Sequence, residues 1–398
     1  YEMGGGMLNV QSDPFLDRCF FWSNEAPFGG GMANTWAMPF GPSSNPQLYR
    51  TEFHDNHAAF GGGGVYNEGS AGHFEECIFV QNGAVEGGGM QSLFAANPLI
   101  YDCEFTQNHA ALGGAMFTGS LSSSLLIDSR LIRNSADEGA GMYEWQASAS
   151  SVHGTEFLQN MASNSGGGIY NADNSAPTVK DSLFAWNFAA NSGGGMFSEK
   201  GSPAVARTHF TENAAINGGG VFNGGDPMMP TTALFTDSLF TENFARDYGS
   251  GMYNSSDAAP TIINTTFKAN VVDGSGGGMF SNQGSKPTLY SCNFLGNRAG
   301  IYGGGMHNVA NAAWVEDCQF ESNESVNAGG GVGNEGASFC NFKACTFIFN
   351  ASENGGGMAN LRGDLPYLES CVFDENAAVF GGGMANFMQS NAVLVQCA

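Results

Sequence analysis

Acidic side chains recur at one position of the sequence, and they are the first candidates for chemistry. Glu76, Asp102 and Asp128 are 26 residues apart, each directly before a Cys or a Ser. If the chain repeats with this period, the three carboxylates stand ~5 Å apart on successive turns. Carboxylates at such a separation can share a Ca²⁺ ion. The sequence therefore offers a candidate calcium site, with a solvated acidic face as the alternative, and no other cofactor is predicted.

Catalysis on acidic polysaccharides would require carboxylates or calcium together with an Arg or Lys base on one face. No column of basic residues accompanies the acidic one, and the seven histidines do not converge. His57 and His109, for example, share an Asn-His-Ala context but lie two repeats apart. We therefore predict that the chain is not an enzyme, and a polysaccharide lyase or hydrolase remains an alternative.

The cysteines follow the repeat as well. Eight of the nine, all but Cys340, occupy one position of the repeat, which lies two residues before the Phe in seven of these eight cases and holds Ser or Thr in other repeats. A thiol that a hydroxyl can replace is expected to be a small stacked residue of the interior. No Cys-x-x-Cys pair or Cys/His cluster is present, so a zinc site is not predicted.

An aromatic stripe is the feature that most strongly suggests binding. The residue after each glycine block and its apolar residue is expected to face outward, and in eight consecutive repeats it is aromatic or His. An exposed stripe of this length is typical of a surface for a partner or a glycan. The alternatives are that loops cover it or that the inward and outward faces are inverted. The eight residues, called the aromatic column below, are Phe117, Tyr143, Tyr170, Phe197, Phe222, Tyr253, Phe280 and His307.

Two loop insertions, near residues 37–46 and 224–230, follow the same predicted strand and rim one edge of the molecule. Solenoids commonly carry function on the loops of one face. A later loop contains Arg362-Gly363-Asp364, which resembles the integrin-recognition tripeptide, although a chance match is easy in a chain so rich in glycine.

The elements that must position these residues are set by an internal repeat. A Gly-Gly-Gly-apolar block, sometimes degraded, occurs fifteen times from Met7 to Met384, mostly at steps of 25 to 27 residues. About eleven residues before each later block stands a Phe-x-x-Asn signature, in which Leu131 once replaces Phe. We predict that its asparagines stack as a hydrogen-bonded ladder. They are Asn24, Asn56, Asn82, Asn108, Asn134, Asn160, Asn187, Asn213, Asn243, Asn270, Asn297, Asn323, Asn350 and Asn376.

One repeat holds two or three strands of three to five residues, which cannot close a core alone. Stacked repeats allow each strand to pair in parallel with its equivalents, ~4.8 Å away. The glycine triplets and the absence of a helical period exclude helical solenoids. We predict an all-β fold: a right-handed, single-stranded parallel β-helix, or β-solenoid, of 14–15 rungs forming one domain over residues 1–398.

Composition restricts the partners. The net charge is −24, with 13 Lys and Arg against 37 Asp and Glu, which opposes binding to nucleic acid. No stretch approaches 18 consecutive apolar residues, so no membrane span is expected. The low share of charged residues and the 32 Phe argue against disorder.

The paired Gly-Gly-x-apolar and Phe-x-x-Asn repeats resemble those of the chlamydial polymorphic outer membrane proteins and of other bacterial surface proteins with right-handed β-helix repeats. The resemblance covers nearly the whole chain. It implies a secreted or surface-displayed passenger, as in autotransporters, with a role in adhesion. The sequence departs from these relatives because it shows no signal peptide and no barrel segment.

The chain begins and ends within a repeat, at Tyr1 and near Cys397. We expect either a piece of a longer protein or a unit that stacks end to end with copies of itself. The predicted function is that of an extracellular or cell-surface structural or adhesive element that contacts a protein or a glycan. A subunit of an extracellular filament or sheath is a second alternative.

Overall fold

The computed structural model describes residues 2–36, 43–225, 228 and 230–398, so parts of the two predicted insertions lie outside the described residues. The described residues form two compact units. Unit 1 comprises Tyr1–Ala190, Gly194–Phe197 and Gly201–Ala204, and unit 2 comprises Asn191–Gly193, Ser198–Lys200 and Val205–Ala398. The prediction of one domain stays a prediction.

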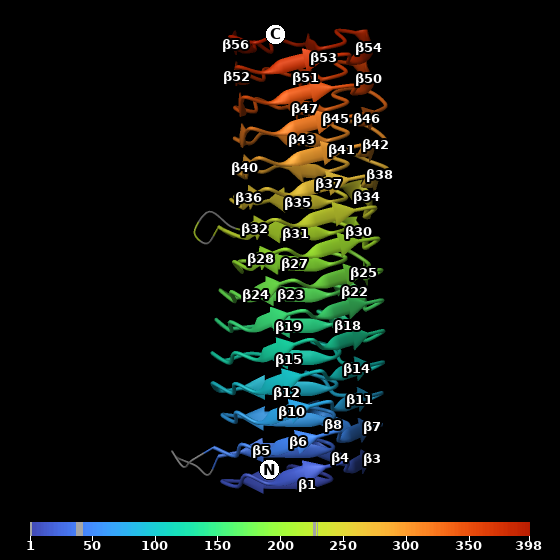
Figure 1. The fold of residues 1–398 in the computed structure, drawn as a ribbon, viewed down its shortest axis with the longest axis vertical. Coiled ribbons are helices and arrows are strands. Elements are labelled where there is room, and N and C mark those ends of the chain that lie inside the picture. Colours follow the sequence, from blue (N-terminus) through green and yellow to red (C-terminus); the bar gives the residue numbers. More distant parts are fainter. Residues whose placement is uncertain (1, 37–42, 226–227, 229) are drawn as a thin grey trace. The chain divides into compact units, whose positions relative to one another are not determined.

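Each turn of unit 1 contributes strands to three sheets, and five turns add a fourth strand (Figure 1). The first sheet contains β1 (Met7–Val10), β5 (Met32–Thr35), β9 (Val65–Glu68), β12 (Met90–Leu93), β15 (Met116–Thr118), β19 (Met142–Glu144) and β23 (Ile169–Ala172). The second contains β2 (Phe15–Asp17), β6 (Gln47–Tyr49), β10 (His73–Glu75), β13 (Leu99–Tyr101), β16 (Leu125–Ile127), β20 (Ser151–His153) and β24 (Thr178–Lys180). The third contains β3 (Phe20–Trp22), β7 (Glu52–His54), β11 (Ile78–Val80), β14 (Glu104–Thr106), β17 (Arg130–Ile132), β21 (Glu156–Leu158) and β25 (Leu183–Ala185). The additional strands are β4 (Glu25–Phe28), β8 (His57–Gly61), β18 (Ser135–Glu138), β22 (Met161–Ser165) and β26 (Phe188–Ala189).

Unit 2 repeats this plan, and β27 (Met196–Glu199) and β28 (Ala204–Ala206) each hold residues of both units. Its first sheet contains β31 (Val221–Gly224), β35 (Met252–Ser255), β39 (Met279–Ser281), β43 (Met306–Val309), β47 (Val332–Glu335), β51 (Met358–Leu361) and β55 (Met384–Asn386). The second contains β32 (Leu234–Thr236), β36 (Thr261–Ile263), β40 (Thr288–Tyr290), β44 (Trp314–Glu316), β48 (Asn341–Lys343), β52 (Tyr367–Glu369) and β56 (Val393–Val395). The third contains β29 (His209–Thr211), β33 (Leu239–Thr241), β37 (Thr266–Lys268), β41 (Asn293–Leu295), β45 (Gln319–Glu321), β49 (Thr346–Ile348) and β53 (Val372–Asp374). The fourth contains β30 (Ala214–Asn217), β34 (Phe244–Tyr248), β38 (Val271–Val272), β42 (Arg298–Ala299), β46 (Glu324–Ser325), β50 (Ala351–Asn354) and β54 (Ala377–Phe380).

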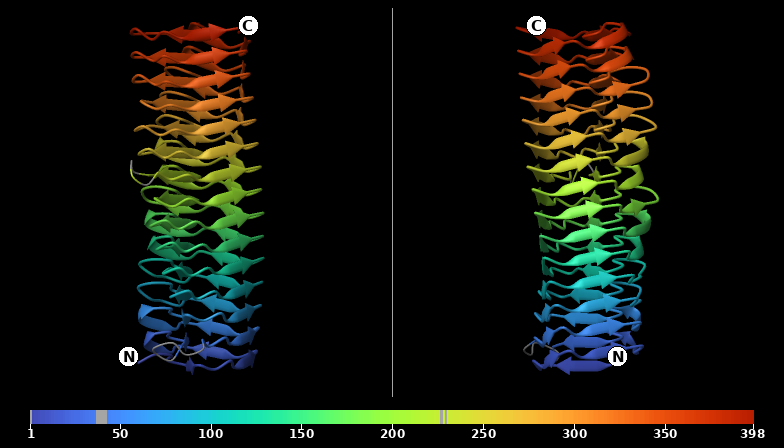
Figure 2. Two further views of the ribbon diagram at one scale, coloured as in Figure 1. Left: turned by 90° about the vertical axis from the view of Figure 1, so that its left-hand side faces the viewer. Right: turned by 45° about the vertical axis from the view of Figure 1, so that its right-hand side comes forward.

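Within each unit, every strand pairs in parallel with its equivalent one repeat away, as the two views of Figure 2 show. In unit 2, Phe294 pairs with Phe320, and their rings stack with centroids 4.8 Å apart and planes 7° from parallel. In unit 1, the rings of Phe53 and Phe79 stack at 4.9 Å. Like side chains therefore lie on like, as the repeat predicts. Among the described residues there is no helix long and apolar enough to cross a membrane.

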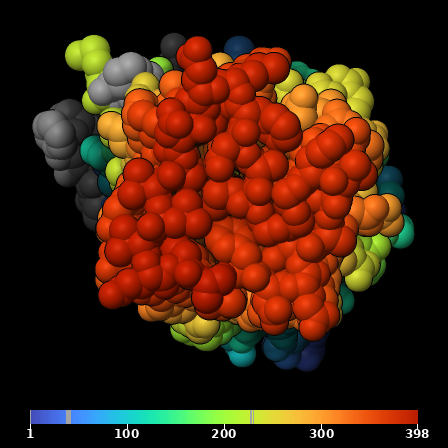
Figure 3. Space-filling model, turned by 90° about the horizontal axis from the view of Figure 1, so that it is seen from above, coloured from blue at the N-terminus to red at the C-terminus, as the bar shows by residue number. Residues whose placement is uncertain are grey.

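The interior combines these stacked phenylalanines with buried amides. The Nδ2 of Asn56 donates to the Oδ1 of Asn82 at 3.0 Å and to the carbonyl of Phe21 at 2.9 Å. The other ladder asparagines of each unit repeat the pattern, and a second ladder follows the methionines, beginning with Asn9 and Asn34 at 2.8 Å. Figure 3 looks onto the last turn of unit 2, whose centre is filled by atoms. The core of each unit is thus packed around hydrogen-bonded amides, although the Nδ2 of Asn67 in the second ladder has no partner within the described residues.

The glycine blocks are required by close approach of the backbone. A Cβ on Gly31 would lie 2.6 Å from the carbonyl oxygen of Gly64 and 2.8 Å from the ring of Phe53. The first glycine of the same block, Gly29, has φ of +64°, a conformation that side chains disfavour. The block therefore lets the chain pass tightly over the stacked phenylalanines at one corner of each turn.

Candidate functional site

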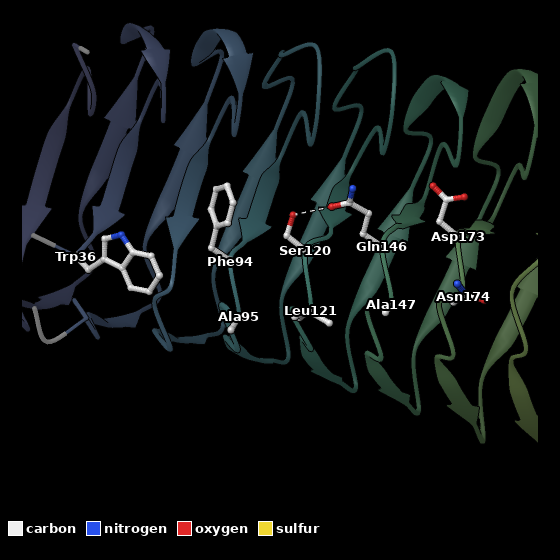
Figure 4. A pocket seen from close by; sticks show the side chains of 9 residues that line it. All are labelled: Trp36, Phe94, Ala95, Ser120, Leu121, Gln146, Ala147, Asp173 and Asn174. Carbon is white, nitrogen blue, oxygen red and sulfur yellow. Dashed lines mark hydrogen bonds between the residues drawn. The ribbon is translucent and has the colours of Figure 1, made fainter. Parts of the chain in front are cut away.

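A groove of about 790 Å³ runs across successive turns of unit 1, where the chain leaves the first sheet (Figure 4). It begins at Trp36, after β5, and continues through the turns that follow β12, β15, β19 and β23. Its walls are formed by Trp36, Phe94, Ala95, Ser120, Leu121, Gln146, Ala147, Asp173 and Asn174. In Figure 4 the side chains of one residue from each of these turns form a row, with those of the next residue beneath.

The lining backbone is a regular platform. From Phe94 onward, each turn places two consecutive residues in the left-handed conformation, as in Ser120 and Leu121 with φ of 53° and 62°. Hydrogen bonds join the turns: the N–H of Leu121 donates to the carbonyl of Gln146 at 3.2 Å. Non-glycine residues with positive φ store strain, which surrounding structure must hold in place. The side chains therefore stand on a rigid support at the spacing of the strands.

Apolar groups are exposed at one end of the groove. The ring of Trp36 lies over Gly69, where a Cβ would come within 2.6 Å of the Trp36 Cε3 atom. Phe94 is 46% exposed and Leu121 is 68% exposed. Flat aromatic faces that remain open to solvent favour contact with the C–H faces of sugar rings or with other apolar surfaces.

Polar groups dominate the other end. Ser120 donates its hydroxyl to the side-chain oxygen of Gln146 at 3.1 Å. Trp145, next to the groove, donates its indole N–H to Oδ2 of Asp173 at 2.6 Å. Amides, hydroxyls and a carboxylate are the groups that bind sugar hydroxyls. Asp173 is the single ionisable side chain among the nine that line the groove, and none of the nine is basic.

The predicted exposure of the aromatic column is wrong. Phe117, Tyr143, Tyr170, Phe197, Tyr253, Phe280 and His307 are buried, and Phe222 is half-buried. The rings still stack in sequence, since those of Phe117 and Tyr143 are 5.4 Å apart and those of Tyr143 and Tyr170 are 4.8 Å apart.

The first glycine of each block lies against the outward residue of its own turn. The positions for a Cβ on Gly139, Gly276 and Gly303 lie 2.6 to 3.0 Å from the Cβ atoms of Tyr143, Phe280 and His307. Segments before the block add further cover, as Tyr248 does for Phe280 at 4.5 Å between ring centroids. The side chains point outward as predicted, but backbone lies over them, so a role of this column in binding stays an untested prediction.

His307 is the polar member of the column. Burial lowers its pKa to about 3, and neither ring nitrogen has a hydrogen-bond partner within the described residues. Its Nε2 lies 3.8 Å from Oε2 of Glu335, and Glu335 accepts from Arg362 at 2.7 Å. His307 is therefore a neutral, enclosed ring and is not open to a ligand.

Glu76, Asp102 and Asp128 occupy one exposed corner of successive turns in unit 1, with φ near 50° at each. Across the described ranges, no three His, Cys, Asp or Glu side chains are arranged to hold a metal ion. The calcium site therefore gains no support from the geometry and stays a prediction. The nine cysteines are free thiols, and seven of them are buried.

The tripeptide Arg362-Gly363-Asp364 does not present its acidic group. Asp364 is buried, and its carboxylate accepts the backbone N–H groups of Ser338 at 2.8 Å and Leu361 at 2.7 Å. Burial raises the pKa of this carboxyl to about 6. The aspartate therefore braces its own loop, whereas recognition by another protein would need it in solvent.

The groove residues are not singled out by the sequence. Trp36, Phe94 and Leu121 are far apart in the chain and belong to no motif. The available signal is their register, because each follows a strand of the first sheet at the edge that the two insertions were predicted to rim. Large apolar residues at a turn position that elsewhere holds small or polar ones would have pointed to this edge.

Three comparisons with known proteins bear on this geometry. The model of a family described as "Right handed beta helix region" matches residues 40–232. No curated protein matches the sequence. Among solved structures, a double mutant of the periplasmic alginate epimerase AlgG superposes with a TM-score of 0.50 and 10% identity, over 77% of this chain and 78% of that chain.

The last comparison corrects one prediction. A protein that shares this fold over most of both chains is an enzyme, so the prediction that the chain is not an enzyme is contradicted. At 10% identity the likeness extends to the fold. The chain is a right-handed parallel β-solenoid, with sheets of up to 15 strands and no helix among the residues described.

Proposed function

We propose that this protein is a polysaccharide-active β-solenoid, and that the groove of unit 1 holds its substrate. The observation that carries the proposal is the row of exposed aromatic, amide and carboxylate side chains on consecutive turns. A ligand that follows the row must itself be extended and repetitive, as a polysaccharide is. Concave sites that combine apolar faces with a few polar groups are the usual form of ligand sites.

The similar structure supports this class of function. That protein is an epimerase of alginate, a polysaccharide, and is periplasmic. Our proposal accordingly includes catalysis on a polysaccharide and a location outside the cytoplasm. Display on a bacterial surface, contact with a protein or glycan partner, and the finer resemblance to the chlamydial proteins remain parts of the proposal that require their own tests.

Charge favours a substrate different from alginate. The chain has a net charge of −24, and no Lys or Arg lines the groove. An anionic polymer would be repelled by the whole protein and would find no cation at the site. We therefore assign to the groove a chain whose bound sugar residues are uncharged.

Asp173 is assigned the proton transfer. It is the one ionisable side chain among the lining residues, and the bond from Trp145 fixes one of its two oxygens. The two-carboxylate arrangement of most glycosidases is not available from the lining residues. The role of Asp173 in this proposal is therefore that of a single acid or base acting on a bound sugar residue.

The test has a binding arm and an activity arm. Affinity is measured by calorimetry for a neutral β-glucan, a mannan and alginate, and products are followed by chromatography. We expect tighter binding of a neutral polymer than of alginate. Replacement of both Trp36 and Phe94 by Ala should weaken binding about tenfold or more, since each aromatic contact contributes ~0.5–1.5 kcal/mol. Asp173→Asn should keep the affinity and abolish product formation.

The matched control is Phe188→Ala, which removes an exposed ring of unit 1 outside the groove. It should leave the affinity unchanged. Equal losses in the control and in the groove variant, or stronger binding of alginate, would contradict the proposal. Full turnover by the Asp173 variant would remove the catalytic assignment and leave the binding site in place.

A further inference from the structure

Two histidines of unit 1 face the same side of the molecule on either side of a glycine, apart from the groove. His57 begins β8, and Gly83 and His109 hold the same place in the next two turns, where parallel bridges join His57 to Gly83 and Gly83 to His109. Side chains at one place of a parallel stack point the same way, and both histidines are exposed. Their backbones lie two turns apart, at ~10 Å, so the rings can share a ligand only if one of them crosses the gap.

The ring of His109 crosses this gap. A Cβ on Gly83 would lie 2.5 Å from Cε1 and 3.2 Å from Cδ2 of His109, and it would overlap Nε2 of the same ring. These are the three atoms nearest to that Cβ position, so the ring fills the space of a side chain at residue 83. The Nε2 atom of His109 therefore lies about one turn, or ~5 Å, from the level of His57.

The backbone at Gly83 does not itself require glycine. Its φ lies outside the left-handed region, and no backbone atom is among the three nearest neighbours of the Cβ position. Other turns of unit 1 carry side chains at this place, namely Glu25, Ser135, Met161 and Phe188. The glycine therefore makes room for the imidazole of His109 on its way toward His57.

The pair has the chemical form that binds metal ions. Partial burial and then the charge of His57 lower the pKa of His109, so the His109 ring is neutral near pH 7. Neither ring makes a hydrogen bond or an ion pair with the residues that the structure describes, which leaves nitrogen lone pairs available. Glu25 stands beside His57 on the side away from Gly83, and the net charge of the chain is −24. Both favour a cation.

We propose that His57 and His109 bind one divalent transition-metal ion, Zn²⁺ or a cation of similar preference, above Gly83. Imidazole nitrogens hold Zn²⁺ at about 2.0–2.1 Å, so the two donor atoms must stand roughly 3–4 Å apart. The exposed ring of His57 reaches this distance by turning toward Nε2 of His109. No third His, Cys, Asp or Glu among the described residues completes a site, so water fills the remaining positions of the tetrahedral ion.

Other occupants fit less well. Ca²⁺ and Mg²⁺ take oxygen ligands, whereas imidazole suits zinc, copper and nickel. An anion would meet the carboxylate of Glu25 and the negative charge of the whole protein. The inference is independent of the polysaccharide proposal, because neither histidine is among the nine residues that line the groove. The alanine variant at Trp36 and Phe94 should therefore bind the metal as the wild type does.

The test measures Zn²⁺ binding by calorimetry at about pH 7.5, with the full chain prepared without a histidine tag. His57→Gln and His109→Gln should each weaken binding about tenfold or more, since even groups that only support a metal ligand contribute 10- to 100-fold. The double variant should lose little more than either single one, because one remaining imidazole no longer chelates. Zn²⁺ should also raise the melting temperature of the wild type and leave that of the His109 variant unchanged.

Gly83→Ala is the sharpest variant, because it keeps both imidazoles and displaces the His109 ring with a methyl group. We expect it to weaken Zn²⁺ binding by about three- to tenfold. His153→Gln is the matched control, since it removes a half-buried histidine of unit 1 outside the pair. Cys19→Ser and Cys397→Ser remove the two thiols that are not buried. All three of these substitutions should leave the affinity unchanged.

Four results would overturn the inference. They are unchanged affinity in either variant of the pair, unchanged affinity in the Gly83 variant, an equal loss in the His153 control or in a cysteine variant, and displacement of Zn²⁺ by a hundredfold excess of Ca²⁺. The last result would indicate an oxygen site on the acidic surface. Retained Zn²⁺ binding without any polysaccharide binding would contradict the proposed function alone.

Discussion

Unit 1 contains two sets of aromatic side chains at nearby positions of the repeat, and the two sets differ in their exposure to solvent. Tyr143 and Tyr170 point outward from the first sheet and are buried, 7% and 6% exposed. Phe94 lies in the turn just after the same sheet and is 46% exposed. The ring of Tyr143 is enclosed between those of Phe117 and Tyr170, and the first glycine of its block lies against its Cβ. In a solenoid of this kind, exposure depends on the path of neighbouring backbone as well as on the alternation of the strand.

The largest effect on stability is expected when a side chain is added to a glycine that lies against the aromatic column. Gly166 has φ of +70°, and a Cβ there would lie 2.8 Å from the Cβ of Tyr170. Gly166→Val should lower the free energy of unfolding by about 4 kcal/mol, from strain and overpacking combined, as measured by urea unfolding. Gly296→Ala is the control: its φ is +61° and nothing lies within 4 Å, so a loss of about 1 kcal/mol is expected. Similar losses in both variants would show that backbone strain alone, and not cover, explains the glycine.

The buried column should matter for stability and not for binding. Tyr143→Ala removes a ring enclosed between Phe117 and Tyr170 and should cost about 3–4 kcal/mol of unfolding free energy. Polysaccharide affinity, measured under conditions where the variant is folded, should not change. A selective loss of affinity with normal stability would restore the column as a binding surface.

The inward face of the same strand should respond to pH. Glu144 is fully buried beside Tyr143, and burial raises its pKa to about 7. Because the folded pKa exceeds the unfolded value, the group costs nothing below about pH 4.5, and stability falls as pH rises to 7. Glu144→Gln should therefore gain up to about 3 kcal/mol at pH 8 and little at pH 4, by urea unfolding. An unchanged pH slope would mean that Glu144 does not hold its proton on folding.

The smallest effect is expected for Gly69, the residue over which the Trp36 ring lies. Gly69→Ala places a methyl group 2.6 Å from the Trp36 ring and should shift that ring without removing it. We expect a loss of polysaccharide affinity of about three- to tenfold, measured by calorimetry, with a stability change near 1 kcal/mol. Unchanged affinity would indicate that Trp36 does not contact the bound chain.

The stacking of the turns could be predicted because the same residue type recurs at the same position of each repeat. Phe294 and Phe320 share a place in the repeat, and only a parallel register brings every such pair together. The candidate groove could not be predicted in this way. Trp36 and Asp173 have no common type, and what unites them is a turn geometry with two left-handed residues that few sequence signals mark. The burial of Tyr143 likewise depends on contact between its side chain and neighbouring backbone. The alternation of residues within one strand gives no information about that contact.

The ladder asparagines bear on how the number of turns in such a protein can change during evolution. Asn82 accepts from Asn56 on one side and donates to Asn108 on the other, and Asn108 does the same with Asn134. Each of these turns thus presents an amide donor to the next turn and an amide oxygen acceptor to the previous one. Loss or duplication of one whole period would rejoin matching surfaces, whereas a change of a few residues within a level would leave amides without partners. Proteins built on this scheme can be shortened or extended by recombination in steps of a complete coil.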